Sequence, residues 1–225
     1  MPMQHSPRDD ASILKWPEKT VERSHQIPAV LLFGMPGVGK GTQGALLGSM
    51  QNLVHVSTGE IFRGLDPNSE DGREVARYID HGELVPDEVS VTIWKHWLDG
   101  EIEAGRIRPT EDILILDGIP RSVKQCELMQ QHIDVLAVIH LEPADDEPII
   151  ERLRGRAITD GRADDADETI IRKRMGIYRD KTSPVVHFYS DDIVHEIDPL
   201  GTQMEIKKRI LEHVIPAIRS FEQAG

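Results

Sequence analysis

The chain has 225 residues and a formal net charge of −13, with 39% hydrophobic and 29% charged residues. These proportions are typical of a globular protein with one sizeable core, and the acidic balance excludes a general nucleic-acid binder. A single cysteine, Cys126, excludes an intramolecular disulfide and any multi-cysteine zinc site. No apolar run is long enough to cross a bilayer and the N-terminus lacks the apolar centre of a signal peptide, so we expect a cytoplasmic protein with no membrane partner.

Residues 1–28 are polar and show no hydrophobic periodicity, so we expect a poorly ordered extension before a folded domain at 29–225. From Ala29 onward, short apolar runs alternate with longer amphipathic ones. The candidate strands are 29–33, 53–56, 113–116, 135–141 and 193–197. The candidate helices are 40–50, 87–103, 123–132, 147–153, 168–189 and 203–219. This alternation predicts an α/β fold, a parallel five-stranded sheet flanked by helices, with ligands beyond the carboxyl ends of the strands.

The first predicted strand leads into a glycine-rich loop, GMPGVGKGTQ, at residues 34–43. Glycines let backbone N–H groups approach a phosphate closely, and the helix that follows directs its positive end at the same anion. Lys40 adds a mobile charge for the β- and γ-phosphates. The pattern departs from G-x-x-x-x-G-K-[ST], because Gly41 takes the Ser/Thr position and Thr42 follows it. The strand–loop–helix context favours a nucleotide phosphate loop over a simple glycine-rich turn.

A glycine after the lysine, followed by Thr-Gln, resembles the adenylate kinase family of nucleoside monophosphate kinases, whose loop reads G-x-P-G-x-G-K-G-T-Q. The resemblance runs from Ala29 to the last predicted helix and leaves out only the extension. It implies a P-loop fold with a small helical NMP-binding lobe at about 57–86 and a short lid at about 154–164. The residues that it implies for ATP binding are Gly37, Val38, Gly39, Lys40, Gly41, Thr42 and Arg152.

Two further segments match the family. STGEIFR at 57–63 follows the second predicted strand and resembles S-T-G-[DE]-x-x-R, which implies a threonine beside the acceptor nucleotide and an arginine on its α-phosphate. GELVPD at 82–87 resembles G-x-L-V-P-D, which implies backbone beside the acceptor base. Taken alone, each segment reads as a capped helix start. The AMP contacts implied here are Thr58, Arg63, Glu83, Leu84 and Val85.

LDGIPRSVKQ at 116–125 follows the third predicted strand, so Asp117 and Arg121 are expected at its carboxyl end. Arg121 can hold a phosphate bidentately, and Asp117 can orient the water shell of a Mg²⁺ ion without binding the metal directly. The segment is similar to the family's L-D-G-F-P-R-[TS]-x-x-Q, with Ile119 in place of the usual Phe. The resemblance implies Mg²⁺ as the cofactor and Gly118 and Arg121 as AMP contacts.

Gln125 ends the same segment and bears on the identity of the acceptor. A carboxamide can both donate to and accept from the Watson–Crick edge of adenine. The related pyrimidine kinases carry Asn at this position. Gln125 therefore favours AMP as the acceptor. Taken alone, a glutamine at this position could equally be a solvent-exposed helix residue that binds no ligand.

Basic residues gather after the fourth predicted strand, where the family has its lid. The resemblance implies that Arg152 lies near the donor base and that Arg156, Arg162 and Arg174 converge on the transferring phosphoryl group, with Arg162 and Arg174 also contacting AMP. The spacing from Arg162 to Arg174 is one residue longer than the family pattern, so Arg172 could replace Arg174. The implied catalytic set is Lys40, Arg121, Arg156, Arg162 and Arg174.

The predicted activity is reversible in-line transfer of the γ-phosphoryl group from Mg-ATP to AMP in a lid-closed site, giving two ADP. ATP and AMP are the expected partners, and we expect a monomer. A pyrimidine (UMP/CMP) monophosphate kinase would share the loop and lid. A hydrolytic P-loop NTPase would present a water-positioning residue rather than a second arginine-rich site. A catalytically silent nucleotide-binding module is the remaining alternative, and Lys40 and the arginines count against it.

Overall fold

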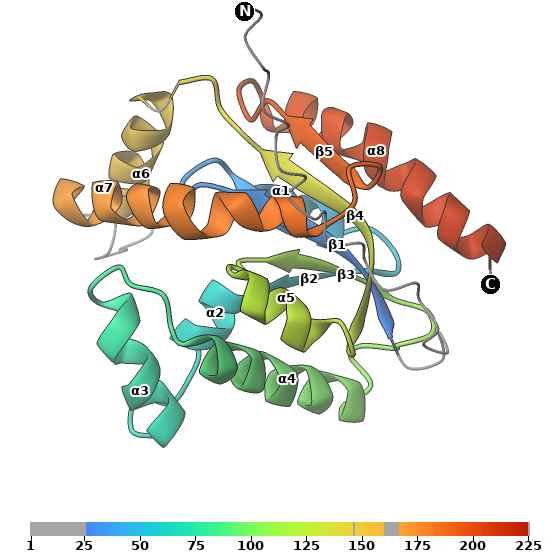
Figure 1. The fold of residues 1–225 in the computed structure, drawn as a ribbon, viewed down its shortest axis with the longest axis horizontal. Coiled ribbons are helices and arrows are strands. Elements are labelled where there is room, and N and C mark those ends of the chain that lie inside the picture. The colour runs from blue at the N-terminus through green and yellow to red at the C-terminus, as the bar shows by residue number, and fades with distance from the viewer. Residues whose placement is uncertain (1–25, 146, 160–166, 225) are drawn as a thin grey trace, which may run out of the picture.

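The structure is a computed structural model that describes residues 26–145, 147–159 and 167–224, without the side chains of 156–159 and 224 (Figure 1). Most of the predicted extension, residues 1–25, therefore lies outside the described residues. Strand β1 (Ile27–Gly34) begins two residues before the predicted domain start at 29. Ile27 N–H donates to His132 O at 3.0 Å, and Pro28 is in register with Asp134. Strand β1 therefore starts two residues before the predicted strand at 29–33, since residues 27 and 28 pair with β4 while pairing with β3 starts at Ala29.

The predicted parallel five-stranded sheet is confirmed, and its strand order is β2-β3-β1-β4-β5. After β1, the strands are β2 (Leu53–Ser57), β3 (Ile113–Asp117), β4 (Ile133–Leu141) and β5 (Val194–Ile197). At the carboxyl ends of the strands, Ser57 is in register with Asp117 and Gly34 with Leu141. These ends bring the motif segments that follow them to one edge of the sheet.

The helices separate into two layers, as expected for a sheet buried on both faces. Their bounds are α1 (Lys40–Gly48), α2 (Thr58–Arg63), α3 (Glu70–Ile79), α4 (Asp87–Glu103), α5 (Val123–Met129), α6 (Glu147–Thr159), α7 (Glu168–Ile177) and α8 (Gln203–Ala224). Val30 and Leu32 of β1 pack with α1, α6, α7 and α8, whereas Leu31 and Phe33 pack with α4 and α5. Figure 1 shows α4 and α5 below the sheet and α8 above it. No helix in the described ranges combines the length and apolarity that a membrane span needs.

Two helix predictions differ from the structure. The helix predicted at 168–189 ends at Ile177 and continues as a π-helical turn, Tyr178–Thr182, and a 3-10 helix, Ser183–Phe188. Pro184 explains the change, because it lacks the N–H that an α-helix would need at that position. The helix predicted at 147–153 continues to Thr159 and so enters the predicted lid. The lid residues 160–164 lie outside the described part of the chain.

Helix α3 stands away from the sheet and, with α2 beside the sheet, completes a small lobe (Figure 1). Val75 of α3 packs with Val85 and Ile93 in a cluster of its own, distinct from the two clusters on the sheet. Helix α3 was not among the named candidate helices, although its start carries a clear signal. Ser69 accepts a hydrogen bond from Gly72 N–H at 2.9 Å and is followed by two acidic residues, the expected pattern of an N-terminus.

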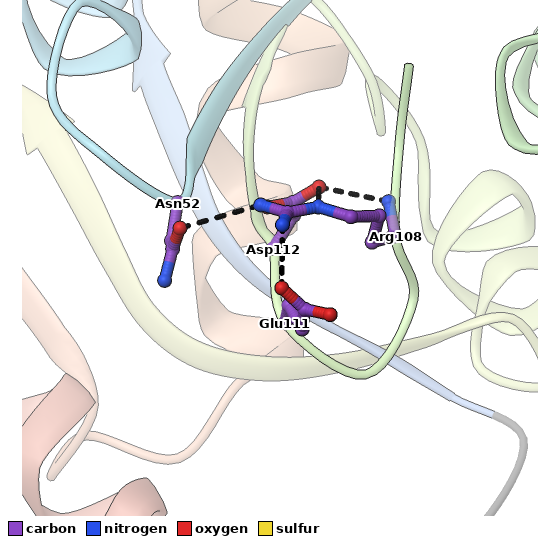
Figure 2. Close-up of polar contacts among 4 residues, drawn as sticks. All are labelled: Asn52, Arg108, Glu111 and Asp112. Carbon is purple, nitrogen blue, oxygen red and sulfur yellow. Dashed lines mark hydrogen bonds and ion pairs between the residues drawn. The ribbon is translucent and has the colours of Figure 1, made fainter. Parts of the chain in front are cut away.

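A polar cluster fastens the amino ends of β2 and β3, at the edge of the sheet opposite the motif segments (Figure 2). Asp112 accepts hydrogen bonds from the Arg108 backbone N–H at 2.8 Å and from its guanidinium at 2.7 Å. The same guanidinium donates to Asn52 Oδ1 at 3.4 Å and to Glu111. Since Asn52 precedes β2 and Asp112 precedes β3, the cluster joins the starts of two neighbouring strands.

Candidate active site

A cleft of about 1130 Å³ opens at the carboxyl ends of the central strands. Its walls come from the phosphate loop, α2, the turn before α4, the segment after β3 and α7. The predicted site residues that line it are Gly37, Val38, Gly39, Lys40, Gly41, Thr42, Thr58, Arg63, Glu83, Leu84, Val85, Asp117, Gly118, Arg121, Gln125, Arg152 and Arg174. The Arg156 side chain and all of Arg162 lie outside the described residues. The fold thus brings all the described candidates to one cavity.

The phosphate loop has the backbone that a phosphate requires. Gly37 has a φ of 88°, and a Cβ there would lie 2.7 Å from Leu153 Cγ, so only glycine fits. The Lys40 ammonium curls back over the loop and donates to Gly34 O at 2.6 Å and Met35 O at 3.1 Å. Two backbone carbonyls of the loop therefore hold this cation beside the loop.

Gly41, which departs from the general phosphate-loop pattern, faces Asp117. A Cβ at Gly41 would lie 3.6 Å from Asp117 Oδ2, so a Ser or Thr side chain would occupy the space between the loop and the carboxylate. Asp117 is 9% exposed, and Thr42 lines the same cleft. Carboxylate and hydroxyl oxygens beside a phosphate loop suit Mg²⁺, which keeps several waters and binds through substrate phosphates. Within the described residues no group of three or more His, Cys, Asp or Glu side chains could hold a metal ion.

Three arginines converge on the far side of the cleft. Arg121 is open to the cleft, and its Nε donates to Gly118 O at 2.8 Å. Desolvation by the surrounding protein lowers the pKa of Arg121, the positive charges of Arg174 and Arg63 lower it further, and Asp117 raises it. Like charges gathered in this way are unfavourable without an anion, so the arrangement suits a ligand with several negative charges.

The geometry distinguishes Arg174 from Arg172, which the sequence left open. Arg174 lines the cleft. Arg172 lies outside it, and its side chain is 56% exposed and donates to Glu168 Oε1 at 2.8 and 3.0 Å. Helix α7 therefore presents Arg174 to the site and Arg172 to solvent.

The segment after β3 packs closely against α2. Gly118 has a φ of 87°, and a Cβ there would lie 2.6 Å from Thr58 Oγ1. Thr58 Oγ1 donates to Asp117 O at 3.3 Å. Gln125, 2% exposed, accepts from Arg121 N–H at 2.7 Å through Oε1 and donates through Nε2 to Asp87 Oδ1 at 2.9 Å. These contacts join α2, the segment after β3 and the starts of α4 and α5 into one wall of the cleft.

The start of α8 supplies cleft residues that the sequence did not single out. Gly201, Gln203 and Ile206 line the cleft on the side of the phosphate loop. Gln43 Nε2 donates to Gln203 O at 3.1 Å and ties the two segments together. Arg152 Nη1 donates to Pro199 O at 3.4 Å in the same region. The glycine in the turn before the last predicted helix was the available sign that this segment belongs to the cleft. That position depends on how α8 packs against α1, which the local sequence does not show.

The parallel sheet, the phosphate loop and the arginine-lined cleft define the class of P-loop nucleotide-binding enzymes. The adenylate kinase family model matches residues 32–194. The chain is 39% identical to the adenylate kinase of Flavobacterium johnsoniae over 80% of this chain and 95% of that protein. It is 38% identical to the adenylate kinase of Kocuria rhizophila over 81% and 96%, and 36% identical to that of Leptospira biflexa over 82% and 98%, respectively. The chain therefore belongs to the adenylate kinase family, as its motifs predicted.

Proposed function

We propose that the chain catalyses reversible transfer of the γ-phosphoryl group from Mg-ATP to AMP, giving two ADP. The observation that carries this proposal is the shared cleft, which has a phosphate loop with Lys40 on one side and three converging arginines on the other. One cavity with two separate polyanion-binding walls suits a reaction between two nucleotides rather than hydrolysis of one. Family membership supports the same activity.

On the donor side, ATP binds with its phosphates along the loop from Gly37 to Thr42 and its base near Arg152. When bound with ATP, Mg²⁺ supplies neutralising charge at the β- and γ-phosphates. Thr42 and Asp117 are the residues that would hold it, and Asp117 would do so through ordered water. Lys40 releases the loop carbonyls and bridges the same phosphates.

On the acceptor side, AMP occupies the lobe at about 57–86, beside Thr58 and the backbone of Glu83, Leu84 and Val85. Arg63 and Arg121 bind its α-phosphate, and Gly118 allows the close packing that this wall needs. Gln125 reads the adenine edge. These assignments rest on the family motifs and on the position of each residue at the cleft.

The transfer itself needs positioning and charge rather than a protein base, since the attacking phosphate oxygen of AMP is already ionised. Arg121 and Arg174 stabilise the charge on the migrating group. We assign the same role to Arg156 and Arg162 of the lid at about 154–164, whose closure would exclude water. All these residues come from one chain, and we propose that the enzyme acts as a monomer in the cytoplasm.

A coupled ADP assay tests this function with ATP and four acceptors: AMP, CMP, UMP and GMP. We expect kcat/KM to be highest for AMP. A preference for UMP or CMP would instead identify a pyrimidine kinase. ATP consumption that does not depend on any acceptor would identify a hydrolytic NTPase and overturn the proposal.

A further inference from the structure

The Gln125 carboxamide is clamped between two groups of opposite character. Its Oε1 accepts from the backbone N–H of Arg121 at 2.7 Å, and its Nε2 donates to Asp87 Oδ1 at 2.9 Å. Arg121 N–H belongs to the segment after β3, and Asp87 begins α4. Gln125 is 2% exposed, so water cannot substitute freely for either partner. Two separate elements thus hold the amide by both ends.

These partners permit only one orientation of the amide. A backbone N–H can only donate, and an ionised carboxylate can only accept. Rotating the amide by half a turn would place an NH₂ group against the Arg121 N–H and an oxygen against the Asp87 anion. Both contacts would be repulsive and both hydrogen bonds would be lost, which is costly for buried groups. The oxygen and nitrogen of Gln125 are therefore not interchangeable.

The clamp leaves Oε1 with one acceptor site and Nε2 with one N–H for a ligand. Adenine presents the complementary order on its Watson–Crick edge, an exocyclic amino donor beside a ring-nitrogen acceptor. A 6-oxopurine presents the reverse, a carbonyl acceptor beside a ring N–H donor. An amide free to rotate would serve either base, whereas the clamped amide serves adenine.

We propose that Asp87 is a specificity-determining positioning residue, which selects AMP over 6-oxopurine monophosphates by fixing the orientation of Gln125. Asp87 does not line the cleft and acts only through the amide. Because the inference concerns the acceptor pocket, it rests on the proposed function. It accounts for discrimination between two purines of nearly the same shape, which size alone cannot give.

The test compares AMP with IMP at saturating ATP, with IMP measured both as an acceptor and as a competitive inhibitor of AMP. Asp87→Asn removes the fixed negative acceptor while keeping the size of the side chain. We expect the AMP-to-IMP ratio of kcat/KM, or of binding constants, to fall by roughly tenfold. Arg121 N–H still opposes rotation in this variant, so part of the preference for AMP should persist.

Two controls separate this role from a general loss of structure. Glu88→Gln removes the neighbouring charge in the same first turn of α4. In this variant we expect the AMP-to-IMP ratio and the AMP-to-CMP ratio to stay at their wild-type values. The AMP-to-CMP ratio should change little in Asp87→Asn, because cytosine presents donor and acceptor in the same order as adenine. If Asp87→Asn does not fold, Asp87→Ser removes the carboxylate while retaining a residue favoured at helix starts.

An unchanged AMP-to-IMP ratio in a folded Asp87 variant that still phosphorylates AMP would overturn the inference and leave the proposed function intact. Equal use of AMP and IMP by the wild-type enzyme would overturn it as well. Failure of the wild-type enzyme to phosphorylate AMP at all would instead refute the proposed function.

Discussion

Arg172 and Arg174 are two positions apart on α7, yet only Arg174 faces the cleft. We predict that Arg174→Ala lowers kcat by about 10³-fold, the lower end for an arginine that stabilises a phosphoryl-transfer transition state. Arg172→Ala loses only an exposed ion pair with Glu168 and should change kcat by about twofold or less. Steady-state kinetics at saturating ATP and AMP checks both variants. A large loss in Arg172→Ala with a small one in Arg174→Ala would reverse the assignment.

Cys126 illustrates a residue whose chemistry is suppressed by packing. Its side chain is 2% exposed, and burial raises the pKa of the thiol to about 12, while the Tyr189 hydroxyl lies 3.4 Å from Sγ. We predict that an aromatic disulfide reagent at pH 8 does not modify the native protein, because the reactive thiolate is scarce and covered. The same reagent should titrate the single thiol after unfolding in urea. Rapid modification of the native enzyme would contradict this burial.

At the scale of elements, the sequence predicted the strands better than the helix ends. Short, continuous apolar runs located all five strands, because strands of a sheet that is buried on both faces carry apolar side chains on both sides. The end of the α-helix at Ile177 was missed, because the amphipathic pattern continues through Tyr178. Pro184 has no N–H to donate to the carbonyl one helical turn earlier, so its effect falls several residues before the proline itself. A helical lobe was predicted here, but α3 received no bounds, because its sequence is largely polar and its Val75 packs in a small cluster with Val85 and Ile93.

The polar cluster around Arg108 joins the starts of β2 and β3, and we expect it to contribute to stability rather than to catalysis (Figure 2). We predict that Asp112→Ala lowers the free energy of unfolding by about 1–3 kcal/mol, because it leaves the Arg108 backbone N–H without its acceptor. That loss corresponds to a melting temperature lower by roughly 2–10 °C. Thermal unfolding followed by circular dichroism measures it.

The control is Glu111→Ala, which removes a carboxylate from the same cluster. The Glu111 side chain is 56% exposed, whereas that of Asp112 is 4% exposed, so the control should be almost neutral. Neither variant should change kcat, since the cluster lies at the edge of the sheet opposite the cleft. Equal destabilisation by the two variants would show that burial of Asp112 does not matter.

For the whole molecule, His140 makes stability depend on pH. Burial lowers the pKa of His140, and His187 lowers it further, against the opposing charges of Glu142 and Glu196. Its Nε2 lies 2.8 Å from the Tyr178 hydroxyl. The folded state therefore favours the neutral ring, and the unfolded chain takes up a proton first as the pH falls below the ordinary value of about 6.5.

It follows that the free energy of unfolding should fall as the pH drops from 7.5 to 5.5. The fall should be smaller in His140→Gln, which cannot be protonated, while all other histidines are common to both proteins. Urea unfolding at the two pH values measures the difference. The same pH dependence in both proteins would show that His140 does not contribute.

Most of the candidate site followed from the sequence because its motifs immediately follow strands, and the carboxyl ends of parallel strands meet at one edge. Lys40, Arg63 and Arg121 reach the cleft for that reason. The partnership of Asp87 with Gln125 joins residues 38 positions apart and depends on how α4 packs against α5, which no local pattern encodes. The contribution of α8 was hidden in the same way.

The most direct test of the account is the stoichiometry of the reaction, followed by ³¹P NMR with Mg²⁺, ATP and AMP. We predict that ATP and AMP disappear in equal amounts, that two ADP form for each AMP consumed, and that the reverse reaction starting from ADP reaches the same equilibrium. Loss of ATP with release of inorganic phosphate while AMP stays constant would contradict the central claim that one cleft joins two nucleotides for phosphoryl transfer.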